Sequence, residues 1–364
     1  MILNKVLFFG PMPPPFHGQS IAFSEYYTSA KGQNKILIDT NLTGATIFNK
    51  VLLTIMYFLK IPALILFKKP TVIYFTCSRS VLGSFKDVWL IFLSILTSTP
   101  IVCHLHGADF KEFYQPLSLP YKSIVGFLYK RLTSVIVLTP GMIEQFEMFP
   151  GMNIHTVSNF YNTSDISIRE KPKNKPGSLN FLYLSNIMET KGIIDLLDAF
   201  DEVVSTYPKA KLLIAGGFVS DIKLSKSKMR KKFFQRLSVE KNIEYFGIVS
   251  GVEKKELLFR ANVLVLPSYY ASEAVPLCII EGMASGCAIL TTKHNYLPDI
   301  VNSKIGELVN PQSVNELASS MNGFIEDNEK VTAMGNYNKE LAKNIYSKKT
   351  YVKAIDAILI DAST

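Results

Sequence analysis

Short apolar runs alternate with segments of helical length along most of this chain, and that alternation constrains the fold strongly. Such runs are typical of parallel strands buried on both faces of a sheet, each followed by a helix that covers it. The runs form two sets, separated by a charged Pro/Gly stretch, Arg169–Gly177, which we interpret as an interdomain linker. The first set is Val6–Phe9, Thr71–Phe75, Ile101–His104, Ser134–Leu138 and Ile154–Val157; the second is Phe181–Leu184, Lys211–Ala215, Ile243–Phe246, Val263–Leu266 and Ala288–Thr291.

The two sets predict an α/β chain with two doubly wound, parallel-sheet domains. A length of 364 residues is sufficient for two hydrophobic cores. We place the first domain at residues 1–165 and the second at 166–344. Ligands bind at the carboxyl ends of parallel strands, so we expect the chemistry at a cleft that both domains share. The last segment, Tyr346–Ile360, has the pattern of an amphipathic helix.

The composition describes a globular chain, with 48% hydrophobic and 19% charged residues. Four scattered cysteines without metal-ligand spacing predict buried, reduced thiols, and hence a cytoplasmic protein. Two apolar segments, Val51–Phe67 and Val88–Thr97, resemble membrane spans at first sight. The first contains Lys60 and Pro62, and the second is about half as long as a bilayer crossing requires, so we expect neither to span a membrane.

The formal net charge of +9 narrows the class of partner. No nucleic-acid-binding motif accompanies the charge, so we expect no nucleic-acid partner. An anionic membrane surface is the other acidic surface that such a protein meets, and Lys68 and Lys69 directly follow an apolar segment. The charge therefore predicts either a peripheral position at the inner face of the plasma membrane or solubility alone, and the sequence leaves both open.

The segment Glu273–Gly286 carries the strongest functional signal. It has two carboxylates eight positions apart, Glu273 and Glu281, between the apolar runs Val263–Leu266 and Ala288–Thr291. Pro276 fits the first turn of a helix, because the N–H that proline lacks has no partner there. The first backbone N–H groups of such a helix bind anions, reinforced by the helix dipole. These groups belong to Leu277, Cys278 and Ile279, and together with the carboxylates they suit a ligand with hydroxyls and a diphosphate, such as a nucleotide sugar.

Three further segments place polar residues after predicted strands. The loop Gly10–Ser20 contains Gly10 and Gly18, where the backbone can approach a ligand closely, and ends at Ser20, which we expect to cap a helix. The segment Ile101–Phe110 ends a strand with His106 and a glycine. His104 lies on the same side of that strand, because side chains alternate with a period of two. The segment Phe181–Phe200 contains Asn186 and Lys191 ahead of an amphipathic helix.

Together these motifs resemble the retaining glycosyltransferases of family 4, which have the GT-B fold. The resemblance covers nearly the whole chain and is most specific from Phe181 to Gly306. It implies two Rossmann-like domains that face a cleft, with a C-terminal helix, here residues 345–364, that crosses back to the first domain. It also implies that Glu281 binds the ribose diol of the nucleotide and that Glu273 lies against the transferred sugar.

The resemblance also implies roles for the other segments. The family's glycine-rich loop, which faces the diphosphate and the acceptor, matches the loop with Gly18, and its donor-sugar histidine matches His106. Lys191 matches a lysine that touches the diphosphate, and Ile248 lies where the family's backbone meets the base. The family has an arginine where this chain has Asn186, which can donate a hydrogen bond to phosphate but carries no charge.

The predicted function is transfer of a sugar from a nucleotide-diphosphate donor to a hydroxyl of a glycan, with retention of configuration. The chain has no Asp-x-Asp motif, so we expect no metal and no cofactor, with the diphosphate neutralised by Lys191, helix N-termini and backbone amides. The basic first domain favours a lipid-linked glycan acceptor, as in capsule, O-antigen or exopolysaccharide assembly. Two alternatives remain: a non-catalytic sugar-nucleotide-binding scaffold, and a GT-B sugar-nucleotide epimerase that acts without an acceptor.

Overall fold

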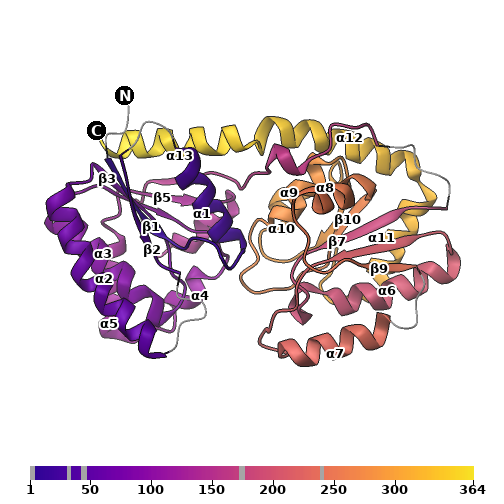
Figure 1. Ribbon diagram of the computed structural model, residues 1–364, viewed down its shortest axis with the longest axis horizontal. Helices are drawn as coiled ribbons and strands as arrows, with labels where there is room; N and C mark the ends of the chain where they lie inside the picture. The colour runs from indigo at the N-terminus through magenta and orange to yellow at the C-terminus, as the bar shows by residue number, and fades with distance from the viewer. Residues whose placement is uncertain (1–4, 31–33, 42–46, 172–176, 238–241) are drawn as a thin grey trace. The chain divides into compact units, whose positions relative to one another are not determined.

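The computed structural model describes residues 5–30, 34–41, 47–171, 177–237 and 242–364, with the backbone alone for 47–55 (Figure 1). Its contacts divide the chain into two compact units. Unit 1 is Met1–Ser158 with Tyr351–Thr364, and unit 2 is Asn159–Thr350. Each unit contains a parallel sheet covered by helices, which is the α/β architecture expected. Among the described residues, no helix combines the length and the apolar character that crossing a bilayer requires.

The sheet of unit 1 has six parallel strands in the order β2-β1-β3-β4-β5-β6. Strands β1, β3, β4 and β5 are apolar and almost wholly buried, because helices cover both faces. The strands are β1 (Lys5–Gly10), β2 (Asn34–Asp39), β3 (Val72–Thr76), β4 (Ile101–His104), β5 (Ser134–Val137) and β6 (Ile154–Thr156).

Helices α2, α3 and α5 lie against one face of this sheet, whereas α1 and α13 lie together on the other (Figure 1). Tyr351 of α13 donates its hydroxyl to the carbonyl of Ala22 at 3.2 Å, and the Tyr26 hydroxyl donates to Asp356 at 2.7 Å. The C-terminal helix is therefore part of unit 1. The helices are α1 (Gly18–Ser29), α2 (Ile47–Lys68), α3 (Val81–Leu96), α4 (Phe110–Tyr114), α5 (Leu119–Tyr129), η1 (Gly141–Phe146) and α13 (Lys348–Ala362).

The sheet of unit 2 also has six parallel strands, in the order β12-β11-β10-β7-β8-β9. Its central strands β7, β8, β10 and β11 are largely apolar runs with β-branched or aromatic residues, which suit a buried parallel sheet. The strands are β7 (Asn180–Leu184), β8 (Lys211–Ala215), β9 (Ile243–Tyr245), β10 (Val263–Leu266), β11 (Ala288–Thr292) and β12 (Gly306–Val309).

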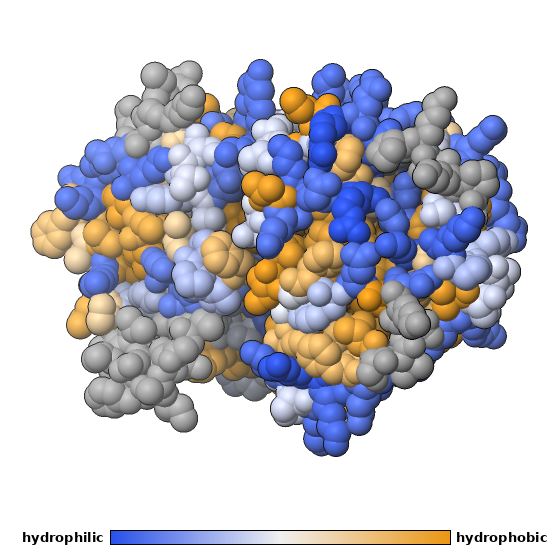
Figure 2. Space-filling model, turned by 45° about the vertical axis from the view of Figure 1, so that its right-hand side comes forward, coloured by the Kyte–Doolittle hydropathy of each residue, from blue (hydrophilic) through white to orange (hydrophobic). Residues whose placement is uncertain are grey.

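Helices α6 and α11 pack together in unit 2, as do α9 and α12. The apolar face of α6 is buried, and its charged positions are the more exposed ones, as expected for an amphipathic helix. The face shown in Figure 2 exposes both hydrophilic and hydrophobic side chains. The helices are η2 (Thr163–Asp165), η3 (Glu189–Lys191), α6 (Ile193–Thr206), α7 (Lys226–Leu237), α8 (Gly251–Arg260), α9 (Leu277–Ala284), α10 (Leu297–Ile300), α11 (Val314–Glu326) and α12 (Asn328–Ile345).

Three features differ from the sequence prediction. Strands β2 and β12 were not predicted, and both lie at sheet edges, where pairing on one side needs no continuous apolar run. The contact division falls at Ser158, earlier than the predicted linker Arg169–Gly177, of which residues 172–176 lie outside the described part. Lys171 contacts the carbonyl of Ala261, so the start of that segment packs on unit 2.

Candidate functional site

The strand order of unit 2 reverses between β7 and β10. From β7 the chain proceeds outward through β8 and β9, and from β10 it proceeds the other way through β11 and β12. In doubly wound sheets, ligands bind at the carboxyl ends of the strands at such a reversal. The segments that follow β7 and β10 carry Lys191 and Glu273, so the structure brings these two predicted site residues together at this point.

Lys191 and Glu273 form a buried ion pair. The Nζ atom of Lys191 lies 2.5 Å from Oε2 of Glu273, and the hydroxyl of Ser268 donates to the same oxygen at 2.6 Å. The Lys191 and Glu273 side chains are only 12% and 7% exposed, so water screens their attraction weakly. Within the described residues no group donates to Oε1 of Glu273. One carboxylate oxygen is thus fixed, while the other has no protein partner.

Contacts of the residues before and after Lys191 fix the backbone at this lysine. Gly192 has φ +73°, and a Cβ there would lie 2.0 Å from the carbonyl oxygen of Pro267, so only glycine fits. The carboxylate of Asp221 accepts hydrogen bonds from the backbone N–H and the hydroxyl of Thr190 at 2.8 and 3.0 Å. Burial opposes ionisation of Asp221, but backbone N–H donors hold its pKa below the usual range. These contacts orient the lysine before any ligand arrives.

Helix α9 begins shortly after Glu273 in the sequence. Pro276 is the residue before the helix rather than in its first turn as predicted, with φ −62° and ψ 128°. Within the described residues, the N–H groups of Leu277 and Cys278 have no acceptor, but Ile279 donates to the carbonyl of Pro276 at 3.2 Å. The helix therefore offers two free amides, and the expectation of a third from Ile279 was wrong. Burial raises the pKa of the Cys278 thiol to about 12, although Lys191 opposes the rise, so the thiol is neutral.

Glu281 lies inside α9 and is buried against a lysine. Its Oε1 atom is 2.5 Å from Nζ of Lys254, which also lies 3.1 Å from Oδ2 of Asp165. Burial raises the pKa of Glu281, and the attraction of Lys254 opposes that rise. Burial opposes the charge of Lys254 in turn, but the Glu281 and Asp165 carboxylates raise the pKa of this lysine. The ammonium group therefore compensates the charge of Glu281 in a largely buried site.

The remaining predicted residues of unit 2 follow other strands. Asn186 is exposed just after β7, and its carbonyl accepts a hydrogen bond from the Tyr183 hydroxyl at 2.8 Å. Ile248 follows β9 and is 82% exposed. A Cβ on Gly217 would lie 2.9 Å from Cδ1 of Ile248, so glycine leaves room for this side chain. Both residues lie at the carboxyl edge of the sheet, and their contacts with a nucleotide stay predictions.

Unit 1 contains the two predicted histidines side by side. The rings of His104 and His106 stack with their centroids 3.9 Å apart, and Nδ1 of His104 lies 2.7 Å from the Tyr74 hydroxyl. Both ring nitrogens of His106 are buried and have no partner among the described residues. Burial, and then the neighbouring His104, Arg79 and His17, hold the pKa of His106 well below its usual range. His106 is therefore a neutral imidazole that can hydrogen-bond a hydroxyl.

Arg79 is a cation beside these histidines that the sequence reasoning missed. It follows β3, and the strand order of unit 1 reverses between β1 and β3. Its guanidinium lies 2.8 Å from Oδ1 of Asp109. A Cβ on Gly107 would lie 1.1 Å from a guanidinium nitrogen of Arg79, so the glycine makes space for the cation. A charged residue directly after a central strand is the signal that would have identified it.

The loop between β1 and α1 differs in detail from the prediction. His17, rather than Ser20, is the N-cap residue of α1: the N–H of Ser20 donates to Nδ1 of His17 at 3.3 Å, and the N–H of His17 donates to Oγ of Ser20 at 3.1 Å. Gly10 serves packing rather than ligand approach, because a Cβ would lie 2.6 Å from the ring of Phe23. A Cβ on Gly18 would meet nothing within 4 Å, so this backbone borders open space.

Residues that no local pattern revealed also shape the site. Ser268 holds Glu273, and Lys254 holds Glu281, as described above. The side-chain amide of Asn159 donates to the carbonyl of Val275 at 2.7 Å, which fixes the backbone just before α9. The partners of Lys254 and Asn159 lie 27 and 116 positions away in the chain. Within the described residues, no group of three or more His, Cys, Asp or Glu side chains has the arrangement of a metal site.

Part of the chain is similar to known proteins. Residues 164–341 match the family model described as "Glycosyl transferases group 1". The chain is 23% identical over 242 residues to the lipopolysaccharide 1,2-N-acetylglucosaminetransferase of Salmonella typhimurium, covering 63% of this chain and 59% of that protein. It is 25% identical over 273 residues to the N-acetyl-alpha-D-glucosaminyl L-malate synthase of Bacillus anthracis, covering 72% of this chain and 68% of the relative.

The fold is shared with solved glycosyltransferase structures. The crystal structure of Anabaena HepE in complex with UDP superposes with a TM-score of 0.76 at 16% identity, covering 98% of this chain and all of the other. At that identity the likeness shows the fold alone. The chain spans only part of the curated relatives that it matches, from 31% to 68% of the length of three of them. Residues 164–341 thus resemble this family, and the chain as a whole has the two-sheet fold of HepE.

Proposed function

We propose that the protein is a retaining glycosyltransferase of family 4 that moves a sugar from a nucleotide diphosphate to a hydroxyl of a glycan. The observation that carries this proposal is the buried Lys191–Glu273 pair at the strand reversal of unit 2, followed in the chain by the free amides of Leu277 and Cys278. A cation and free N–H groups suit a departing diphosphate, and a buried carboxylate suits positive charge at an anomeric carbon.

In the proposed reaction, the bond between the anomeric carbon and the oxygen of the β-phosphate breaks. The acceptor oxygen forms a bond to that carbon on the same face, and the acceptor proton passes to the departing nucleotide diphosphate. Lys191 and the α9 amides stabilise the negative charge that develops on the diphosphate. Glu273 stabilises the positive charge on the sugar, and Glu281 accepts hydrogen bonds from the ribose hydroxyls. The roles of Gly18 and His106 of unit 1 stay predictions, as does independence from a metal.

The acceptor in this proposal is a lipid-linked glycan of a surface polysaccharide, with the protein at the inner face of the membrane. The basic charge of the chain supports this choice. So does the relative from Salmonella typhimurium, whose name says that it acts on lipopolysaccharide. The HepE structure of the same fold is a complex with UDP, which makes uracil the first base to test.

A thermal-shift screen with nucleotides and their sugar conjugates tests the proposal. A bound donor raises the melting temperature by mass action, and we expect one nucleotide family to do so. Incubation with that donor and a glycan acceptor should then give a product whose anomeric configuration, read by NMR, equals that of the donor. A scaffold would be stabilised without turnover, an epimerase would convert the donor alone, and an inverted product would contradict retention.

The contact between Lys254 and Glu281 predicts an altered pH dependence. Ribose hydroxyls need an ionised acceptor, so nucleotide affinity should fall as the pH drops through the pKa of Glu281, which burial already raises. In Lys254→Met the opposing attraction is lost and this pKa rises further. The fall should then move to a higher pH. Calorimetric titration of the nucleotide between about pH 8 and pH 5 measures it.

The matched control for this experiment is Lys255→Met, which removes the neighbouring lysine of α8. Lys255 has no ion pair among the described residues, so its variant should keep the pH profile of the unchanged protein. If both variants lost affinity at the same pH, Lys254 would not govern the ionisation of Glu281.

A further inference from the structure

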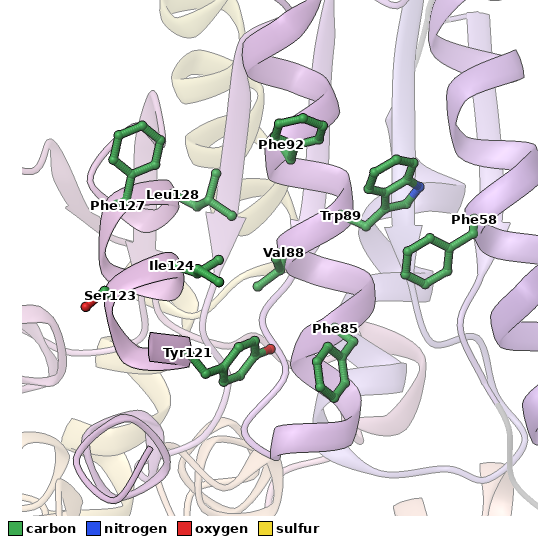
Figure 3. A pocket seen from close by; sticks show the side chains of 10 residues that line it. All are labelled: Phe58, Phe85, Val88, Trp89, Phe92, Tyr121, Ser123, Ile124, Phe127 and Leu128. Atoms are coloured by element: carbon green, nitrogen blue, oxygen red, sulfur yellow. The ribbon is translucent and has the colours of Figure 1, made fainter. Parts of the chain in front are cut away.

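Helices α2, α3 and α5 of unit 1 enclose an apolar hollow that none of the predicted site residues lines. Its volume is about 630 Å³. Figure 3 shows side chains of α3 and α5 directed toward the space between these helices, with a ring from α2 beside them. Six aromatic residues line it: Phe58, Phe85, Trp89, Phe92, Tyr121 and Phe127.

The rings of this hollow are ordered by mutual stacking but remain open to solvent. The ring of Trp89 stacks on Phe58 at 5.1 Å and on Phe92 at 5.7 Å between centroids. Phe127 is 56% exposed and Phe85 is 43% exposed. Monomeric proteins seldom expose contiguous apolar patches of this kind without a binding role. The indole N–H of Trp89 also has no acceptor among the described residues.

The exposed charged residues of these three helices are all positive. Their only acidic residue is Asp87, which is fully buried and accepts hydrogen bonds from the backbone N–H of Ser78 and from Lys86 at 2.7 and 2.6 Å. Cations, by contrast, border the aromatic rings. The guanidinium of Arg131 stacks on the ring of Phe127 at 3.5 Å from its centroid, and Lys122 adjoins Tyr121 in the chain.

We propose that this aromatic face of unit 1 docks on the surface of an anionic phospholipid bilayer. The rings would enter the boundary between headgroups and acyl chains, and the surrounding lysines and arginines would contact the phosphates. Tryptophan and tyrosine favour that boundary, because each has an apolar ring with one polar atom. Docking rests on the proposed function in one respect: its purpose is to bring the enzyme to a lipid-linked acceptor.

The charge distinguishes a bilayer from a second copy of the chain. Two copies that paired through this face would bring cations against cations, with no exposed carboxylate on these helices to match them. An anionic lipid surface supplies the opposite charge along the whole rim. It also supplies apolar chains for the rings.

Trp89 is the only tryptophan of the chain, so its fluorescence reports on this hollow alone. The purified full chain should cosediment with vesicles of phosphatidylglycerol and phosphatidylcholine, and less with phosphatidylcholine alone. With brominated acyl chains in the anionic vesicles, the Trp89 emission should shift to the blue and be strongly quenched. High salt should weaken binding, because the cationic contribution is screened.

Two matched variants complete the test. Phe85→Asp places a carboxylate in the hollow and should weaken vesicle binding at least about tenfold. Phe234→Asp changes an equally exposed phenylalanine, 39% against 43%, on α7 of unit 2, and should bind as the unchanged protein does. Absence of binding to anionic vesicles, unquenched Trp89 in bound protein, or full binding by Phe85→Asp would each overturn the proposal. So would a dimer that Phe85→Asp dissociates, because the face would then join two copies.

Failure of this proposal is separable from failure of the proposed function. A chain that ignores vesicles but is still stabilised by a nucleotide sugar would keep its proposed activity and lose only this docking surface. A chain that binds vesicles through Trp89 but no nucleotide would keep the docking surface and lose the activity.

Discussion

Glu273→Gln is expected to lower the rate of sugar transfer by about 100-fold or more, with nucleotide affinity nearly unchanged. The substitution keeps the shape of the side chain and its hydrogen bond with Ser268, but removes the negative charge. That charge lies in a buried position, where water cannot replace its effect on a positively charged sugar. Initial rates of transfer at saturating donor, together with calorimetric titration of the nucleotide, separate the two quantities.

The chain contains a matched control for this variant. Glu307 also pairs with a lysine, Lys330, at 2.7 Å, but this pair is partly exposed on the surface of unit 2. Glu307→Gln should transfer sugar at the rate of the unchanged protein, because surface ion pairs contribute little. Equal rates for Glu273→Gln and Glu307→Gln would remove Glu273 from the reaction and favour a scaffold.

Lys191→Met should reduce kcat/KM for the donor by about 100-fold or more, since it removes the cation assigned to the diphosphate. It should also weaken binding of a nucleoside diphosphate more than binding of the nucleoside. No arginine follows β7 to share the task, because Asn186 occupies that place. Methionine preserves the apolar length of the side chain, so the loss reports on charge. Steady-state kinetics and competition by the nucleoside and its diphosphate measure both effects.

Loss of Lys191 also leaves Glu273 buried without its cation, which costs about 3 kcal/mol of unfolding free energy or more. Melting curves should therefore accompany the kinetics. Lys330→Met, from the surface pair, is the control and should change neither stability nor kinetics appreciably. If Lys191→Met bound the nucleoside and its diphosphate with unchanged affinity, the cation would serve the fold and not the ligand.

Local patterns predicted the elements that depend on local physics. A strand buried between two layers of helices must be apolar along its length, so the central strands were recognisable from composition alone. The start of α9 was recognisable because proline is favoured at the beginning of a helix, although the structure places Pro276 one residue outside it. Strands β2 and β12 were not predicted because they lie at sheet edges. An edge strand pairs on one side only, so its sequence can mix polar and apolar residues.

Two predictions about single residues were wrong because they depend on the atoms that pack against the residue. Gly10 was read as a point of ligand approach, but the ring of Phe23 occupies the space a Cβ would need. Ile279 was counted among the free amides, but the turn before α9 lets it donate to Pro276. In both places the sequence shows which residue types are present, and neighbouring atoms decide what they do.

The sequence by itself determined the α/β class, the positions of the buried strands along the chain and the segments that hold the candidate site, because each follows from the spacing of apolar and turn residues. The tertiary structure alone decided which side chains meet. Lys191 and Glu273 are 82 positions apart, and Lys254 and Glu281 are 27 apart. The first pair comes together because strand β10 pairs beside β7 rather than beside β9, and the second because helices α8 and α9 flank β10.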